Sequence, residues 1–192
     1  MKIARIGQLT GNTSTGVWNM SEAYPLMLST VDELNCLPRI LDKLDWLPVD
    51  EAAQAIIEIA NLAQAGGKSS SPEGDDCTIY HVLNDAAAAS FTDLLKWLHE
   101  STNRQFDIVE PQKWVKALEG LEQHPAKALL GLWNRAYCGE EEPNEEQKGP
   151  ASIVFETRKA KEESLTMKNV QPVSKELVLK IWQWLEKEVN SS

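Results

Sequence analysis

Apolar and polar residues follow two different periods along this chain, one typical of strands and one typical of helices. Short runs rich in apolar and β-branched residues predict strands at residues 3–6, 77–83 and 106–109. The first run is interpreted as a buried strand that ends at Gly7 and leads into a glycine-containing loop at residues 11–16. A buried strand needs neighbours on both edges, and nothing precedes this one to supply them, so the pattern indicates a truncated or split domain.

Apolar residues at helical spacing predict a helix-rich remainder. Ser21 is a candidate cap for a helix over residues 22–34, and residues 36–43 are expected to be irregular. Residues 46–50 are predicted to be extended and to lead into a helix capped by Asp50. The core-facing positions expected on that helix are Ile56, Ile59, Ala60 and Ala63. Further helices are predicted at residues 91–100, from Pro111, from Pro125 and after the candidate cap Ser174.

Two stretches poor in apolar residues divide the chain. Residues 67–76 are rich in Gly, Ser and Pro and are predicted to be a linker, and residues 139–150 are predicted to be an acidic loop. They separate a first unit at residues 1–66, a second at residues 77–138 and a C-terminal helical segment at residues 151–192. A few strands among many helices indicate a mixed α/β fold weighted towards helix.

Charge and cysteine content exclude several classes of protein. The net charge is −10, and an acidic chain repels phosphate backbones and anionic lipids, so neither nucleic acid nor a membrane is an expected partner. Cys36, Cys77 and Cys138 form no CxxC pair, which argues against zinc ribbons and thioredoxin-like sites. No secretory signal is visible, and no apolar run approaches the ~20 residues that cross a bilayer, so a cytoplasmic location is expected.

None of the common catalytic templates is present. Gly11 and Gly16 have the spacing of a phosphate-binding loop, but Val17 and Trp18 stand where Lys and Ser/Thr are required. No GxGxxG turn opens a helix, no Tyr is followed four positions later by Lys, and no GxSxG elbow occurs. The three histidines have no metal-ligand spacing. The residues therefore predict no catalytic group and no metal site.

Several segments, in order along the chain, resemble one family of enzymes. Residues 5–11 and 15–19 look like the strand and loop that follow the catalytic helix of thioester reductase domains. Residues 45–53 resemble the same family's version of the V-D-x-A helix start of extended short-chain dehydrogenases. Further resemblance to the family's following strand and C-terminal end is found at residues 80–84, 155–160, 164 and 172–174. The chain thus resembles the C-terminal part of the reductase domain of fungal adenylate-forming reductases, carboxylic acid reductases and nonribosomal peptide synthetase-like enzymes.

The resemblance implies a fold and a reaction. The fold is the C-terminal edge of a Rossmann-like sheet plus the mainly helical substrate-binding subdomain of an extended short-chain dehydrogenase, with the N-terminal Rossmann half missing. Such domains use NADPH to release acyl, peptidyl or polyketide chains from a phosphopantetheine carrier protein as aldehyde or alcohol in secondary metabolism. The family's glycine fingerprint and Tyr–Lys pair have no match here, so no catalytic residue is carried over.

The same resemblance places a few residues near ligands. Gly7 and Gln8 correspond to positions beside the nicotinamide end of NADP, which this chain alone is not expected to bind fully. The positions expected on the substrate side are Gly11, Thr13, Thr15 and Trp18. The implied partners are a phosphopantetheine carrier protein or a polypeptide that supplies the Rossmann half.

Three hypotheses remain open at this point. The chain is the substrate-side part of a reductase and inactive alone, or it is a non-catalytic remnant or pseudo-reductase that binds a carrier protein or small molecule. The third hypothesis is an unrelated α/β domain, which a fold without a strand at residues 3–6 would support. Turnover with an added Rossmann half separates the first hypothesis from the second.

Overall fold

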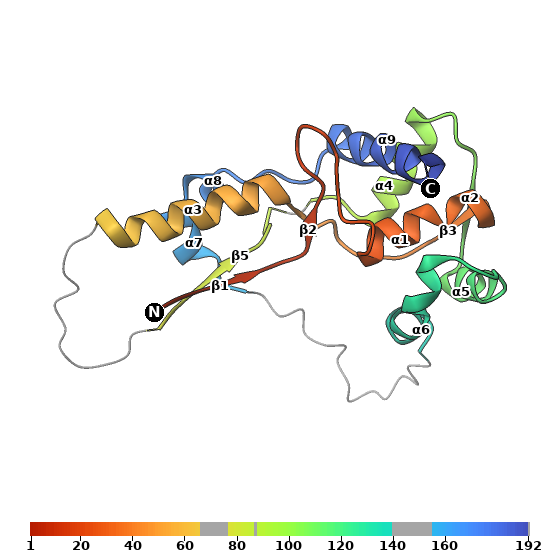
Figure 1. Cartoon of the computed structure of the whole chain (residues 1–192), viewed down its shortest axis with the longest axis horizontal. Coiled ribbons are helices and arrows are strands. Elements are labelled where there is room, and N and C mark those ends of the chain that lie inside the picture. Colours follow the sequence, from red (N-terminus) through yellow and green to blue (C-terminus); the bar gives the residue numbers. More distant parts are fainter. Residues whose placement is uncertain (66–76, 87, 140–154, 192) are drawn as a thin grey trace.

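The computed structural model describes residues 1–65, 77–86, 88–139 and 155–191, which form two lobes side by side (Figure 1). The sheet lobe contains β1 (Lys2–Ile6), α3 (Val49–Ala65), β5 (Thr78–Val82), α7 (Arg158–Glu163) and α8 (Leu165–Lys168). The helical lobe contains α1 (Ala23–Ser29), α2 (Val31–Leu34), β3 (Cys36–Pro38), α4 (Phe91–Ser101), β6 (Asp107–Val109), α5 (Pro111–Glu119), the 3-10 helix η1 (Pro125–Leu129), α6 (Leu130–Tyr137) and α9 (Lys175–Ser191). The short strands β2 (Leu9–Thr10) and β4 (Leu47–Pro48) lie between the lobes.

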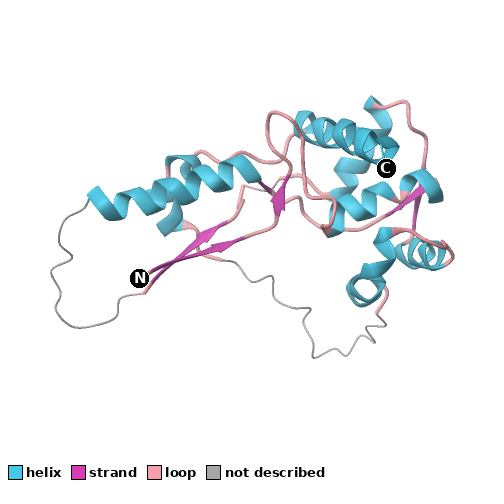
Figure 2. Cartoon of the chain, in the orientation of Figure 1, coloured by secondary structure: helices cyan, strands magenta, loops and turns pink. Residues whose placement is uncertain are grey.

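Among the described residues, the strands form three small parallel pairs rather than one continuous sheet, and Figure 2 shows their short arrows. β1 pairs with β5 from Lys2 opposite Thr78 to Ile6 opposite Val82, β2 pairs with β4, and β3 pairs with β6. Helix-rich α/β architecture with a strand at residues 3–6 was expected from the sequence and is confirmed. The segment at residues 36–43, expected to be irregular, instead begins with β3, because Leu37 and its neighbours are buried against the helical lobe.

The prediction that the first strand is buried is wrong. All five residues of β1 are exposed, with Ile3 at 36% and Ile6 at 45%. The strand pairs on one edge only among the described residues, so its other edge carries backbone N–H and C=O groups without strand partners. Lys2 anchors the start of the strand, because its Nζ donates to the Ile59 carbonyl at 2.9 Å and to Glu163 at 2.7 Å.

The sheet lobe is held together by a small apolar core between β5 and the helices α3, α7 and α8. On α3 the inward positions are Ala52, Ala55 and Ile59, each at most 4% exposed. The expected inward positions Ile56 and Ala60 are exposed, because the core contacts only one narrow side of the helix. α3 also begins at Val49. Asp50 therefore lies within its first turn and is not its N-cap, which corrects the sequence prediction.

The larger core lies in the helical lobe and is built around buried tryptophans and leucines. The helices predicted at residues 91–100, from Pro111 and after Ser174 are confirmed, and the Ser174 hydroxyl accepts a hydrogen bond from the Leu177 N–H at 3.3 Å. The helix predicted over residues 22–34 is divided into α1 and α2 at Thr30. Its N-cap is Glu22 rather than Ser21, and no side-chain cap forms there. The segment from Pro125 begins as a 3-10 helix before α6.

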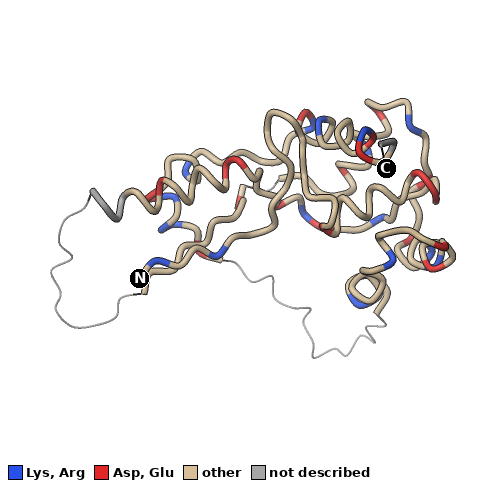
Figure 3. Tube along the Cα trace, in the orientation of Figure 1, with Lys and Arg blue, Asp and Glu red and all other residues tan. Residues whose placement is uncertain are grey.

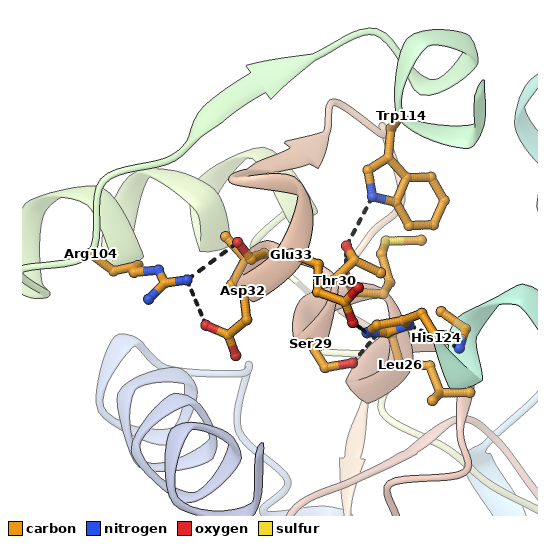
Figure 4. A network of polar contacts seen from close by, with 11 residues as sticks. Leu26, Ser29, Thr30, Asp32, Glu33, Arg104, Trp114 and His124 are labelled. Carbon is orange, nitrogen blue, oxygen red and sulfur yellow. Dashed lines mark hydrogen bonds and ion pairs between the residues drawn. The ribbon is translucent and has the colours of Figure 1, made fainter. Parts of the chain in front are cut away.

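Polar contacts tie α1 and α2 to the elements packed around them (Figure 4). The Trp114 indole N–H of α5 donates to the Thr30 hydroxyl at 3.0 Å, and Arg104 pairs with Asp32 at 2.5 Å. His124 accepts from the Ala126 N–H at 3.1 Å through Nδ1, which caps η1. These contacts satisfy polar groups where the helices of this lobe meet.

Charged residues of both signs are interspersed over the tube of the described chain, without one dominant basic or acidic element (Figure 3). None of the described helices is long and apolar enough to cross a bilayer. The predicted linker at residues 67–76 and residues 140–150 of the predicted acidic loop lie outside the described residues. The division into units at those boundaries stays a prediction.

Candidate functional site

A cavity of about 330 Å³ lies where the two lobes meet. Its walls come from the loop after β2, the start of α3, the segment before α9 and the first turns of α9. The residues that line it are Thr13, Pro48, Glu51, Gln171, Pro172, Val173, Ser174, Glu176, Leu177 and Lys180. We call it the interlobe pocket. It combines an apolar side made by prolines and aliphatic residues with a polar side that carries three charged groups.

The loop at residues 11–16 approaches α9 closely because it contains two glycines. Gly16 has a φ of +72°, and a Cβ added there would lie 2.4 Å from the carbonyl carbon and oxygen of Lys180. A Cβ on Gly11 would lie 2.4 Å from the Gly16 carbonyl oxygen. The loop is closed on itself by Asn12, whose side-chain oxygen accepts from the Ser14 N–H at 2.9 Å. These contacts give the loop a defined shape next to α9.

Thr13 at the tip of this loop connects α3 with α9. Its N–H and hydroxyl donate to the two carboxylate oxygens of Asp50 at 3.0 and 2.5 Å. Its carbonyl oxygen accepts from Lys180 Nζ at 2.7 Å. Asp50, which was expected to cap α3, therefore holds the loop instead, and both of its carboxylate oxygens are occupied.

Asn84 holds two segments next to the pocket in place through hydrogen bonds. It follows β5 and is 1% exposed. Its side-chain NH₂ donates to the carbonyls of Trp46 and Gln171, both at 3.0 Å, and its oxygen accepts from the Ala86 N–H at 3.0 Å. The carboxyl end of β5 is thereby joined to the segment before β4 and to the segment before α9. Ligands commonly bind outside the carboxyl ends of parallel strands, and the pocket lies there.

The charged groups of the pocket differ in their surroundings. Burial is the main cause that raises the pKa of Glu51, and the nearby charge of Asp50 raises it further. The pKa of Glu176 is lowered instead, because its carboxylate accepts hydrogen bonds from its own backbone N–H and from Ser174. Lys180 is held by the Thr13 carbonyl. Glu51 is thus the charged group that the described part of the protein leaves least satisfied.

Of the residues expected on the substrate side, only Thr13 lines the interlobe pocket. Gly11 shapes the loop, and Thr15 is exposed and bonds within it at 3.3 Å to Asn12. Trp18 is 7% exposed and packs edge-on against Trp46 with ring centroids 5.0 Å apart. The sequence did not indicate Gln171 and Lys180, because each enters the pocket through a tertiary contact. Ser174 was predicted there as a helix cap and as part of a segment that resembles the family, not as a pocket residue.

The expected nicotinamide-side residues are engaged within the protein. A Cβ on Gly7 would lie 2.6 Å from the Leu83 Cβ. This glycine therefore lets the chain just after β1 pack closely against the chain just after β5. The Gln8 amide donates to the Leu9 carbonyl at 2.8 Å and to Glu22 at 3.0 Å. Their contact with a nicotinamide stays a prediction, and the chain has no glycine fingerprint to hold a pyrophosphate. The described residues therefore do not fit NADP as a complete site.

The described residues that line the pocket include no nucleophile hydrogen-bonded to a histidine general base. Hydrogen bonds of Thr13 and Asn84 fix its walls. Its lining suits a ligand that is apolar along most of its length. Among the described residues, no group of three or more His, Cys, Asp or Glu side chains is placed to hold a metal ion. The class of protein that these features describe is a helix-rich α/β module with a pocket between its two lobes.

Comparison with known proteins gives this module a family context. The terminal R domain from the myxalamid polyketide synthase–nonribosomal peptide synthetase pathway matches with a TM-score of 0.68 at 18% identity, over 97% of this chain and 43% of that chain. A thiolation-reductase di-domain from an archaeal nonribosomal peptide synthetase matches with a TM-score of 0.61 at 18% identity, over 100% and 37%. The chain therefore has the fold of part of a terminal reductase domain.

Curated sequences agree with this result. Clavatol synthase of Penicillium crustosum is 27% identical over 192 residues, which is 95% of this chain and 6% of the relative. An adenylate-forming reductase of Stachybotrys bisbyi is 26% identical over 190 residues, 93% of this chain and 16% of the relative. No family model matches the chain. The resemblance to terminal reductase domains of polyketide and nonribosomal peptide synthetases is confirmed, and the chain spans only a small part of these curated relatives.

Proposed function

We propose that this chain forms the substrate-side part of a terminal thioester reductase. In that role it holds an acyl, peptidyl or polyketide chain, delivered as a thioester on the phosphopantetheine arm of a carrier protein. NADPH-dependent reduction then releases the acyl, peptidyl or polyketide group as an aldehyde or alcohol. The cofactor and the proton-donating residues are held by a Rossmann-type part of the reductase, on the same polypeptide or another one. The 192 residues alone are inactive in this proposal.

The observation that carries the proposal is the surface of the sheet lobe. β1 is exposed at every residue, pairs on one edge only within the described chain, and presents Ile3 and Ile6 to solvent. Helix α3 beside it exposes Ile56 at 36% and Ile57 at 52%. An open strand edge with apolar side chains is a surface that proteins normally cover or pair. A further parallel strand and its helix would cover it, as in a Rossmann sheet.

The position of the interlobe pocket also supports the proposal. Its lining includes Thr13, which follows β2, and Glu51, which follows β4, so it lies beyond the carboxyl ends of that parallel pair, where an open α/β sheet presents its ligands. The solved reductase domains that share this fold include one linked to a thiolation domain. A carrier-bound acyl chain could therefore reach the pocket from the side on which a neighbouring cofactor half would hold its nicotinamide.

Reconstitution with a partner half tests the proposal. The Rossmann half of the Stachybotrys bisbyi adenylate-forming reductase is co-expressed with this chain, and loss of NADPH absorbance and formation of aldehyde are followed with acyl-carrier thioesters. We expect the halves to co-purify and to turn over, while neither half alone does so. Thioester binding without turnover in the assembled pair would instead favour the non-catalytic alternative.

A matched pair of variants locates the contact. Ile6→Glu places a charge on the open edge of β1, and Leu132→Glu places one on α6 at the far lobe; both side chains are 45% exposed. Because both positions face solvent in this chain, both variants should fold. We expect Ile6→Glu to abolish assembly and Leu132→Glu to leave it intact. Equal assembly by the two variants would show that β1 is not the contact.

A further inference from the structure

The carboxylate of Glu51 is the feature of the interlobe pocket that the fold leaves unexplained. Glu51 lies in the first turn of α3, is half-buried and lines the cavity. Within the described chain it has no hydrogen-bond or ion-pair partner, whereas Glu176 bonds to Ser174 and Lys180 donates to the Thr13 carbonyl. A charged group taken out of water without a partner costs free energy, which a donor on a ligand would recover.

A role at the helix start does not account for this residue. A glutamate in a first turn normally gains from the helix dipole, which favours its charged form and lowers its pKa. For Glu51 the direction is opposite, because burial and the charge of Asp50 raise the pKa. Keeping this carboxylate in the cavity therefore costs free energy. Its place at the start of α3 does not explain why it faces the cavity.

The charge balance around the cavity indicates what Glu51 would bind. Asp50, Glu51 and Glu176 are acidic, and Lys180 is the basic residue in the lining. Asp50 is already saturated by two hydrogen bonds from Thr13. A further carboxylate on a ligand would be repelled, whereas a hydroxyl or ammonium group would find an acceptor in Glu51.

We propose that Glu51 makes this pocket selective for acyl chains that carry a hydrogen-bond donor, a hydroxyl or a protonated amine, at the end remote from the thioester. Pro48, Pro172, Val173 and Leu177 provide the apolar contacts for the methylene portion of such a chain. The volume of about 330 Å³ suits a short acyl chain and lies within the ~300–1,000 Å³ of small-molecule pockets. This inference rests on the proposed function, because it assigns the pocket to the acyl group of that reaction.

Binding of model thioesters to the purified chain tests the inference without turnover. The probes are S-acyl pantetheine thioesters with heptanoyl, ω-hydroxyhexanoyl, ω-aminohexanoyl and adipoyl groups, which have similar lengths and differ at the remote end. Dissociation constants come from NMR titration. We expect the hydroxyl and amino chains to bind about tenfold more tightly than heptanoyl, and adipoyl to bind most weakly. Donor preference restricted to one of the two groups identifies which donor the pocket accepts and still supports the inference.

Variants at Glu51 decide whether this residue is responsible. Glu51→Leu removes both acceptor oxygens and should abolish the preference for donors. Glu51→Gln keeps one acceptor without the charge, so the preference for the amine should fall more than the preference for the hydroxyl. Glu122→Gln, at an exposed position away from the pocket, controls for the loss of one negative charge and should change nothing. Equal binding of heptanoyl and the donor chains, or a preference that survives Glu51→Leu, overturns the inference.

The two proposals fail in different ways. If the reconstituted reductase reduces heptanoyl and ω-hydroxyhexanoyl thioesters equally well, the proposed function stands and the role of Glu51 is wrong. If donor chains bind the pocket through Glu51 but the assembled halves show no NADPH oxidation with any thioester, the site is selective and the reductase function is wrong. If no pantetheine thioester binds the chain at all, the assignment of the pocket to the acyl group is refuted.

Discussion

Replacing Asn84 by alanine tests whether one buried amide holds the walls of the interlobe pocket together. The side chain is 1% exposed and makes three hydrogen bonds of 3.0 Å, to the carbonyls of Trp46 and Gln171 and from the N–H of Ala86. Alanine removes all three bonds and leaves two carbonyls and one N–H without partners. No other side chain among the described residues donates to either carbonyl.

The expected cost follows from those three groups. A hydrogen bond contributes about 1 kcal/mol net, and a buried polar group left unpaired costs about 1–3 kcal/mol. Water that enters part of the vacated volume would satisfy some of these groups. We therefore expect the free energy of unfolding to fall by about 3 kcal/mol. In a chain of this size that corresponds to a decrease in Tm of about 6–12 °C. Because typical domains have only ~5–15 kcal/mol of stability, such a loss is easy to detect.

Urea denaturation followed by tryptophan fluorescence measures the change, since Trp46 beside Asn84 is fully buried. Asn169→Ala is the matched control, because Asn169 is exposed and its side chain makes no hydrogen bond or ion pair within the described residues. It should stay within about 0.5 kcal/mol of the wild type. The Asn84→Ala chain should also bind acyl pantetheines more weakly, since Gln171 lines the pocket. A loss below about 1 kcal/mol would refute the view that this amide joins the two lobes.

Three further substitutions test individual contacts. The Ser164 hydroxyl, just before α8, and further hydrogen bonds hold the pKa of Glu58 at about 2, below its usual 4.5. Glu58→Gln should therefore destabilise at neutral pH, and the difference should fade as the pH drops from 4.5 towards 2 in pH-dependent urea titrations. Thr13→Val removes the hydroxyl bond to Asp50 and should cost about 1 kcal/mol by thermal denaturation. Gly16→Ala places a Cβ against the Lys180 backbone at positive φ and should cost about 2 kcal/mol or more; an unchanged Tm would show that the loop does not pack there.

Local pattern and local chemistry were sufficient for much of the fold. The strand at Thr78–Val82, the helix at Phe91–Ser101 and the Ser174 cap were all predictable, because the hydrophobic period and the capping hydroxyl act within a few residues. The ordered series of short motifs also indicated the reductase resemblance that the comparisons confirm. The candidate site was only partly predictable: Thr13 lines it, whereas Trp18 is a core residue.

The sequence alone determined that most of the helices and the longer strands exist, roughly where they lie, and which family the chain resembles, because those properties depend on neighbours in the chain. Only the tertiary structure decided which faces are covered. It left β1 exposed instead of buried and placed Asp50 on the Thr13 loop instead of at a helix cap. It also brought Glu51 and Lys180, which are far apart in the sequence, to one cavity. Burial and long-range hydrogen bonds arise from packing between distant segments, which a local pattern does not encode.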